Sequence, residues 1–253
     1  MTESTTRFAP GDAESLGSDP ESATKGYRGV AMEGAIARWY DRTRGTPTQV
    51  AAWQRQAVET VASLPAGAQV LEVAPGPGYF SVELARTGRA RVTALEISRT
   101  FVEIAQRRAA LAGVGLDVRQ GDAARMPFPD NSFDLVVCQA AFKNFSRPQA
   151  AVNEMYRVLR PGRSASIEDM RRDAPDELIR QEVDAMGLRP LRAYFTRRAL
   201  VSLRRRAYTK EQFALLARRS PFGECVIKVD GIGLEVRLFK PASGPSLGSE
   251  RLQ

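Results

Sequence analysis

Residues 69–81 read Gln-Val-Leu-Glu-Val-Ala-Pro-Gly-Pro-Gly-Tyr-Phe-Ser, and the rest of the chain is organised around this stretch. Its first part, 70–73, is an apolar run broken by one glutamate, which is typical of a buried parallel strand. A loop of small residues follows at 74–78, and helical spacing begins at Phe80. A strand that passes through a glycine loop into a helix presents backbone N–H groups to a ligand. The stretch therefore predicts a cofactor-binding turn.

After this turn the sequence alternates between helical and strand patterns. Helices are expected at 79–87, 98–112 and 148–159, and strands at 91–97, 116–120, 133–140 and 164–169. Such alternation predicts right-handed βαβ units and a parallel sheet. Two more helices, one at 27–44 and one ending near Leu64, precede the first strand and are expected to cap the sheet.

The pattern changes after Arg171. Residues 175–219 read as helical, and Thr209 with Gln212 fits a capping box at the start of the last helix. Two alternating strands, 224–229 and 234–239, are joined by Asp-Gly-Ile-Gly, which predicts an antiparallel hairpin. At the two ends of the chain, the composition predicts a disordered arm at 1–26 and a flexible tail at 241–253.

The net charge of +8 is unevenly distributed. The first 26 residues carry −3, whereas 189–219 holds ten basic side chains against Glu211 alone. Three interpretations of this basic segment stay open: a solvated helical cap, an electrostatic funnel for an anionic small substrate, and a nucleic-acid surface. Its few aromatic residues do not form a series of stacking platforms, so nucleic acid is the least favoured partner.

The residue types that are missing limit the chemistry. The sequence contains no histidine, which excludes a Ser-His-Asp triad, a Cys-His pair and a histidine-bearing zinc site, and no metal is expected. Cys138 and Cys225 are too few for a disulfide framework and predict a reducing compartment. There is no apolar run of 18 residues and no signal-peptide pattern, so a cytoplasmic protein without membrane insertion is expected.

Two classes of cofactor fit a Gly-x-Gly turn. A nicotinamide dinucleotide would need a third Gly or Ala where the chain has Ser81, and Glu72 would repel its pyrophosphate. S-Adenosylmethionine (SAM) carries an ammonium and a sulfonium and no phosphate, so an acidic strand end suits it better. Glu96 ends the second strand, where a carboxylate can accept hydrogen bonds from both ribose hydroxyls, and Asp122 could accept from an adenine amino group.

Four ordered motifs lie between residues 69 and 169: Val-Leu-Glu-Val-Ala-Pro-Gly-Pro-Gly-Tyr, Ala-Leu-Glu-Ile-Ser, Gly-Asp-Ala-Ala-Arg-Met-Pro-Phe-Pro-Asp-Asn-Ser-Phe-Asp and Arg-Val-Leu-Arg-Pro-Gly. In these motifs the chain resembles the class I SAM-dependent methyltransferases that act mainly on small molecules. The resemblance implies an α/β, Rossmann-like fold with a seven-stranded, mostly parallel sheet and a C-terminal antiparallel hairpin. Residues 27–240 would form this domain, with an N-terminal helical cap at 27–65 and a helical insertion at 175–219.

The resemblance also implies the contacts to the cofactor. SAM would be held by Glu72, Ala74, Gly76, Gly78, Tyr79, Glu96, Ile97, Asp122, Ala123, Gln139 and Ala140. Two positions depart from the family pattern. Ala74 replaces the first glycine of the usual loop, and 141–145 reads Ala-Phe-Lys-Asn-Phe where similar enzymes often have a histidine that faces the substrate.

The acceptor pocket is expected between the N-terminal helices, the 141–145 loop and the 175–219 insertion. Candidate substrate contacts are Trp39, Tyr40, Phe142, Lys143, Asn144, Tyr194 and Arg197. Candidate catalytic groups are Lys143, Glu168, Tyr27 and Tyr40. For the aromatic candidates, core or helix packing is the competing interpretation, and for Lys143 it is a solvated loop position.

The expected function is a biosynthetic one: transfer of the SAM methyl group by direct displacement to an O, N, S or C nucleophile of a small organic molecule, anionic molecules included. Two alternatives stay open. The first is an RNA methyltransferase or a basic RNA-binding protein on the same fold, and the second, less favoured, is an NAD-dependent oxidoreductase. The acceptor atom, the use of a general base and the oligomeric state are left open.

Overall fold

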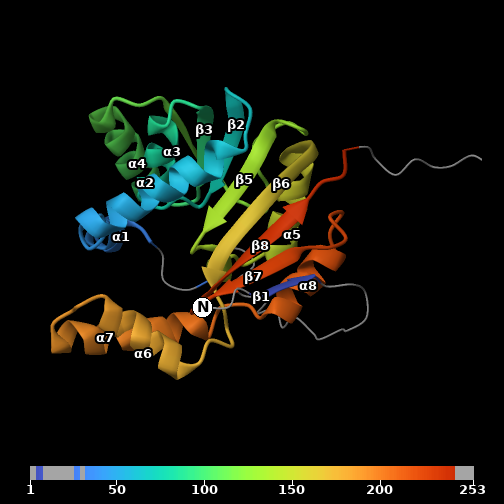
Figure 1. The fold of residues 1–253 in the computed structure, drawn as a ribbon. Helices are drawn as coiled ribbons and strands as arrows, with labels where there is room; N and C mark the ends of the chain where they lie inside the picture. Colours follow the sequence, from blue (N-terminus) through green and yellow to red (C-terminus); the bar gives the residue numbers. More distant parts are fainter. Residues whose placement is uncertain (1–3, 8–25, 29–31, 243–253) are drawn as a thin grey trace, which may run out of the picture.

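The computed structural model describes residues 4–7, 26–28 and 32–242, and its strands form one sheet in the order β1-β7-β8-β6-β5-β2-β3-β4 (Figure 1). The five strands from β2 to β6 are parallel, whereas β8 pairs antiparallel with β6, β7 with β8, and β1 with β7. The strands are β1 (Ser4–Arg7), β2 (Ala68–Val73), β3 (Ala90–Glu96), β4 (Leu116–Gln120), β5 (Phe133–Gln139), β6 (Leu159–Met170), β7 (Val226–Asp230) and β8 (Gly233–Phe239).

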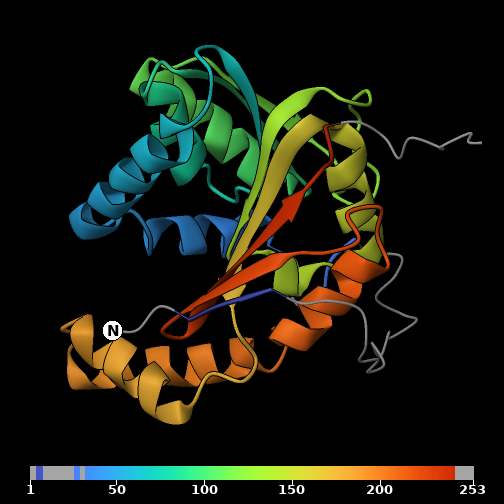
Figure 2. The same ribbon diagram turned by 45° about the vertical axis from the view of Figure 1, so that its right-hand side comes forward.

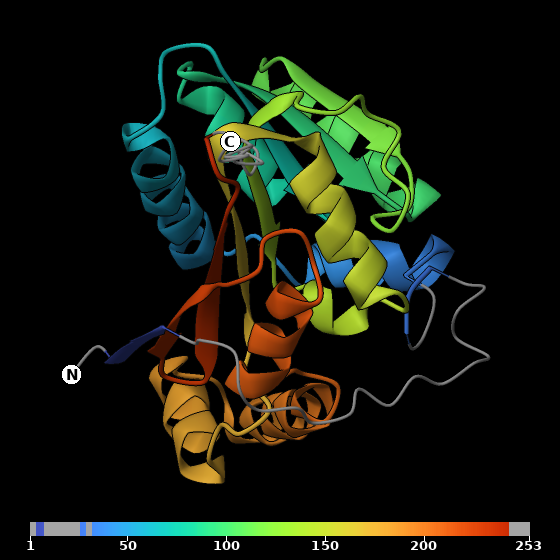
Figure 3. The ribbon, with the colours of Figure 1, turned by 90° about the vertical axis from the view of Figure 1, so that its right-hand side faces the viewer.

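Helices cover both faces of the sheet (Figures 1 and 3). On one face α2 (Pro47–Ala62) and α3 (Tyr79–Arg86) pack against β2 and β5, and α4 (Arg99–Ala112) packs against β3 and β4. On the other face α5 (Pro148–Val158) and α8 (Lys210–Arg218) bury a larger core. The remaining helices are α1 (Gly34–Arg42), α6 (Asp176–Ala185) and α7 (Pro190–Arg204), with a 3₁₀ turn η2 (Phe142–Asn144) after β5.

Local signals in the sequence explain where three of the helices begin. Thr46 caps α2 with Pro47 as its first residue, Ser98 caps α4, and the predicted capping box between Thr209 and Gln212 is present at α8. An N-terminal cap of this kind satisfies backbone N–H groups that have no partner inside the helix. The boundaries of the central elements therefore follow from the sequence.

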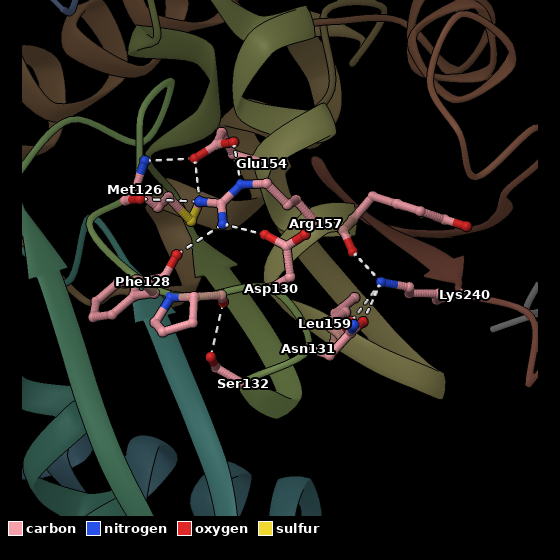
Figure 4. Close-up of polar contacts among 11 residues, drawn as sticks. Met126, Phe128, Asp130, Asn131, Ser132, Glu154, Arg157, Leu159 and Lys240 are labelled. Carbon is pink, nitrogen blue, oxygen red and sulfur yellow. Dashed lines mark hydrogen bonds and ion pairs between the residues drawn. The ribbon is translucent and has the colours of Figure 1, made fainter.

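The Arg-Val-Leu-Arg-Pro-Gly motif contacts the turn that follows β4 through polar side chains (Figure 4). The Arg157 guanidinium contacts Glu154, Asp130 and the carbonyl oxygens of Met126 and Phe128 at 2.7–3.0 Å. Glu154 also accepts a hydrogen bond from the Met126 N–H, and the ion pair holds the pKa of this carboxyl below its usual value. Arg157 thus connects the Arg-Val-Leu-Arg-Pro-Gly motif to the turn that follows β4.

The N-terminal part of the chain differs from the prediction. Ser4–Arg7 form β1, the eighth strand, inside the segment expected to be a disordered arm, while residues 8–25 lie outside the described ones. The helix expected at 27–44 is shorter than predicted: α1 begins at Gly34, and Tyr27 instead forms a β-bridge with Phe145. Of the predicted tail, 243–253 also lies outside the described residues.

The predicted helical insertion at 175–219 divides into two parts. Helix α8 belongs to the core, because Phe213 and Leu216 are buried there with residues of β5 and α5. Only α6 and α7 stand apart from the sheet, as a hairpin beyond the C-terminal ends of β5 and β6 (Figures 1 and 2). In the described part of the chain, no helix combines the length and apolar character needed to span a membrane.

Candidate functional site

The order of the strands reverses between β2 and β5, which are neighbours in the sheet but lead to opposite edges. Ligands of open parallel sheets bind outside the carboxyl ends of the strands at such a point. Just beyond these two ends, Ala74 and Ala140 have φ angles of +57° and +53°. Residues other than glycine rarely adopt this left-handed region, and such strain concentrates at functional sites.

The glycine loop has one open and one closed position. A Cβ on Gly76 would meet nothing nearer than the Phe101 ring at 4.0 Å, so space is free above its α-carbon. A Cβ on Gly78 would lie 2.7 Å from the Ala105 Cβ, because this residue packs against α4. Both have positive φ angles, but only Gly76 faces room for a ligand.

Glu96 holds the glycine loop against β3. One carboxyl oxygen accepts a hydrogen bond from the Gly76 N–H at 2.9 Å, and the other accepts one from the Ser98 N–H at 2.9 Å. Burial raises the pKa of this carboxyl, although these hydrogen bonds oppose the rise. Ile97 adds a further backbone contact, and since a carboxylate can accept about four hydrogen bonds, Glu96 keeps capacity for a ligand hydroxyl.

Glu72 is buried one strand away and accepts a hydrogen bond from the Ser81 hydroxyl on α3. Burial raises its pKa to about 7, and repulsion from Glu96 and Glu168 adds to the rise. A buried carboxylate without a cation favours its neutral form, and a cationic ligand would reverse this preference. Glu72 is therefore suited to a positively charged group.

Glu168 completes a group of three carboxylates, here called the acidic trio: Glu72, Glu96 and Glu168. Its side chain accepts a hydrogen bond from Gln56 of α2 at 2.7 Å and also interacts with Gln139 at the end of β5. Burial raises its pKa. Among the described residues, no member of the trio forms an ion pair, and Arg237 only partly offsets the charge of Glu168, so this region keeps an excess of negative charge.

The residues predicted to hold adenine lie together at the ends of β3 and β4. A Cβ on Gly26 would collide with Ile97 and would lie 3.4 Å from a carboxyl oxygen of Asp122. Asp122 also accepts a hydrogen bond from the Ala124 N–H at 2.8 Å and pairs with Arg147. The segment at Gly26 therefore lies over both side chains. Ala123, predicted beside them, packs partly into the larger core.

Lys143 is neither a solvated loop lysine nor a group open to substrate. It is 5% exposed, and its ammonium lies 2.7 Å from a carboxyl oxygen of Asp169, which is also buried. The ammonium donates a second hydrogen bond to the Ala140 carbonyl, and the other Asp169 oxygen accepts one from the Lys143 N–H at 2.8 Å. The pair braces the strained turn after β5.

Two other predicted contacts are structural in this arrangement. Phe142, expected to contact substrate, is fully buried, with its ring 5.1–5.5 Å from those of Phe145, Tyr208 and Phe213. Tyr79, expected to contact the cofactor, has both ring faces occupied. Trp53 stacks on it at 4.9 Å, and the Arg108 guanidinium lies 3.5 Å from the ring centre. Tyr79 therefore joins α2 to α4.

The other acceptor-side candidates are spread over three elements. Trp39 is largely exposed on α1, and Tyr40 meets the edge of Phe101 at 5.9 Å. The Asn144 carbonyl accepts a hydrogen bond from the Arg28 N–H, next to the bridge that Tyr27 makes. Burial raises the pKa of Tyr27. Tyr194 and Arg197 are exposed on α7.

Two residues of the site, Gln56 and Ser81, and the pairing of Asp169 with Lys143 are not predicted by the sequence. Gln56 binds Glu168, Ser81 binds Glu72, and Asp169 neutralises Lys143. In the sequence, Ser81 stands out only because it occupies the position of a glycine in the dinucleotide fingerprint. Gln56 lies on α2, and no local signal in the sequence shows which face of this helix meets the sheet. In the described part of the chain, no group of three or more Cys, Asp or Glu side chains is placed to hold a metal ion.

Comparison with known proteins agrees with this geometry. Residues 71–167 match the family model described as "Methyltransferase domain". This segment is therefore similar to methyltransferase domains over less than half of the chain. The chain is also similar in fold to a structure from Methanococcus maripaludis described as a candidate S-adenosyl-L-methionine-dependent methyltransferase, with a TM-score of 0.64 and 20% identity over 86% of this chain and 98% of that one. The described part of the chain thus has the class I, Rossmann-like methyltransferase fold, extended by β1.

Two relatives found at the sequence level are methyltransferases by name. A demethylmenaquinone methyltransferase of Deinococcus radiodurans is 36% identical over 112 residues, which cover 44% of this chain and 46% of that protein. A ubiquinone/menaquinone biosynthesis C-methyltransferase of Roseobacter denitrificans is 40% identical over 100 residues, which cover 38% and 40%. The chain therefore spans less than half the length of either relative.

Proposed function

We propose that this protein transfers the methyl group of SAM to a nucleophilic atom of a small organic molecule. The acidic trio is the observation that carries this proposal. Glu72 and Glu168 flank the switch point, Glu96 holds the glycine loop, and no member of the trio forms an ion pair among the described residues. A cationic cofactor relieves this excess negative charge, whereas the pyrophosphate of a dinucleotide would add to it.

Each part of the site has a role in holding this cofactor. The free space at Gly76 lets SAM approach the main chain closely. The lone pairs of Glu96 that the protein leaves free accept hydrogen bonds from the ribose hydroxyls. Glu72 stabilises positive charge, and Ile97 with Asp122 bounds the adenine end beside Gly26. When bound, SAM supplies a methyl group activated by a sulfonium. The chain aligns the acceptor with that methyl group and excludes water.

On the acceptor side, Glu168 is the titratable group best placed to accept a proton. It lies opposite Gln139 near the C-terminal end of β6, and burial raises its pKa, which brings the carboxyl nearer to the range of a useful general base. Lys143 does not compete for this role, because Asp169 and the Ala140 carbonyl bind its ammonium. The quinone substrates named for the two relatives make demethylmenaquinone a first acceptor to test.

Calorimetry with S-adenosylhomocysteine and with NADH tests the cofactor. We expect the wild-type protein to bind S-adenosylhomocysteine and not NADH, and Glu96→Gln to weaken binding about tenfold or more, because a hydrogen bond to a charged group contributes about 1.5–3 kcal/mol. Glu103→Gln, on the exposed side of α4 beside Arg99, is the matched control. Binding of NADH but not of S-adenosylhomocysteine would overturn the proposal.

Labelled methyl transfer tests the acceptor. With methyl-labelled SAM, demethylmenaquinone and a fractionated small-molecule extract, we expect label in a small molecule. Glu168→Gln should lower kcat, since this carboxyl is the group placed to accept the proton. Label that enters only RNA or protein would show that the substrate class is wrong while leaving the cofactor assignment intact.

A further inference from the structure

Helix α7 has an outer face that packs against nothing in the described structure. None of its residues is buried, although Ala193, Thr196 and Leu200 are partly covered on the side towards α6. On the outer side, Leu191 is 69%, Tyr194 48% and Phe195 60% exposed. Their spacing of three and four residues places them on one face of the helix. This set is called the apolar triplet.

The charge of the α6–α7 hairpin is divided between its helices. Residues 189–206 contain seven arginines and no acidic residue, whereas α6 contains four acidic residues and one arginine. Arg204 is used within the hairpin, in a 2.6 Å ion pair with Asp176, and Arg198 lies over the Tyr194 ring. In the described structure no ion pair is formed by Arg189, Arg192, Arg197 or Arg205.

We propose that α7 docks the protein onto a lipid bilayer that carries anionic headgroups. An interfacial helix buries large apolar side chains at the boundary between headgroups and acyl chains, while neighbouring arginines bind lipid phosphates. The apolar triplet and the unpaired arginines around it provide both parts on one helix. The acidic residues of α6 fix the orientation, because repulsion from the same headgroups keeps that helix on the far side.

Two other occupants fit this face less well. Single-stranded nucleic acid needs flat aromatic platforms, but the Tyr194 and Phe195 rings meet edge to face at 74°, and an exposed leucine offers a base nothing to stack on. A second copy in a two-fold contact would bring the same arginines opposite each other. An anionic bilayer instead binds both features of this face: its headgroups bind the arginines, and its acyl chains bury the apolar triplet.

Docking through α7 would place the site near the membrane surface. The α6–α7 hairpin lies beyond the C-terminal ends of β5 and β6 (Figures 1 and 2). Ala140 and Glu168 belong to the same C-terminal edge of the sheet. Since α7 is peripheral and offers only three large apolar side chains, this attachment is reversible and needs no spanning helix. The inference is independent of the methyl-transfer proposal, because it concerns where the protein works.

Co-sedimentation of the full chain with lipid vesicles tests the proposal. Vesicles of phosphatidylcholine alone are compared with vesicles that also contain phosphatidylglycerol, at low and high salt. We expect binding only to the anionic vesicles. Leu191→Ser with Phe195→Ser should weaken it about tenfold or more, and Arg192→Gln with Arg205→Gln by a similar factor.

Matched controls lie elsewhere on the surface. Leu111→Ser changes a leucine that is 85% exposed at the far end of α4, and Arg55→Gln with Arg107→Gln removes two exposed arginines of α2 and α4. Both controls should bind anionic vesicles like the wild type, and circular dichroism should show unchanged helix content in every variant.

Four results would overturn the proposal: no sedimentation with anionic vesicles, equal binding to both vesicle types, equal losses in the controls, or full binding by the Leu191→Ser/Phe195→Ser variant. Tighter binding to an RNA oligonucleotide that survives loss of the apolar triplet would assign the face to nucleic acid. A dimer in sedimentation equilibrium that the same variant abolishes would assign it to a second copy.

Discussion

Replacing Glu72 with glutamine tests two effects of this buried carboxyl separately: its effect on the stability of the ligand-free protein and its effect on affinity for SAM. Glu72 is 3% exposed and accepts a hydrogen bond from Ser81. Burial, together with repulsion from Glu96 and Glu168, raises its pKa to about 7. Glutamine has nearly the same shape, carries no charge and can keep the Ser81 hydrogen bond. We therefore expect Glu72→Gln to stabilise the ligand-free protein above neutral pH.

The size of this effect follows from the pKa. A carboxyl whose pKa is higher in the folded than in the unfolded protein stabilises the fold while it is protonated. This contribution is fully present below pH 4.5 and is lost as the pH rises through about 7. The rise corresponds to about 3 kcal/mol of unfolding free energy, since one pKa unit is about 1.4 kcal/mol. In a chain of this length, that is a Tm difference of about 6–12 °C.

Urea unfolding of the ligand-free proteins measures the difference. Near pH 8.5 we expect Glu72→Gln to exceed the wild type by about 3 kcal/mol, and near pH 5 the two should be almost equal. The control is Glu83→Gln, which removes a buried carboxylate of α3 that has Arg86 as its partner at 3.3 Å and should give no gain. Equal unfolding free energies of wild type and Glu72→Gln at both pH values would refute the reasoning.

The same variant should bind SAM less well. The positive charge of the ligand favours ionised Glu72, so wild-type affinity should rise with pH until about pH 7, by up to about tenfold per pH unit. Calorimetry over this range should show no such rise for Glu72→Gln. A rise of the same size in the variant would show that another group is responsible.

Two further predictions concern the braced turn and the glycine loop. Lys143→Met leaves Asp169 buried without its cation, so it should lower the free energy of unfolding in urea by about 3–5 kcal/mol. Adding Asp169→Asn should recover most of this loss. A double variant as unstable as Lys143→Met alone would contradict the pairing. Gly78→Ala should lower Tm more than Gly76→Ala in thermal unfolding, because only the Cβ at position 78 meets Ala105. In calorimetry, Gly76→Ala should weaken S-adenosylhomocysteine binding more than Gly78→Ala. The opposite ranking of the two variants in both assays would contradict the geometry.

The central sheet could be predicted because local sequence determines it. β2 and β5 are buried on both faces, so their sequences are nearly continuous apolar runs that contrast with the loops around them. The capping residues of α8 and the turn between β7 and β8 also act over a few residues only. Strand β1 has no such signal, since four polar residues at the edge of a sheet resemble a loop.

The direction of side chains in the site could not be predicted in the same way. Lys143 and Phe142 follow β5 in a loop whose sequence suits a substrate contact, yet both point into the protein. Their partners, Asp169 and Tyr208, lie 26 and more residues away in the sequence. Such contacts depend on the register of β5 against β6 and on the packing of α8, which local sequence does not contain.

The inward position of Lys143 affects how the reaction can handle a proton. Its ammonium binds the Ala140 carbonyl, while the Ala140 N–H donates to the Glu168 carbonyl at 2.7 Å, so the left-handed turn is fixed from both sides. The loop in which a base was expected therefore acts as a brace. The titratable side chain next to this turn is Glu168, whose raised pKa suits it to accept a proton. An acceptor that must be deprotonated would therefore depend on Glu168, whereas one that is already nucleophilic would need only the alignment that the braced turn provides.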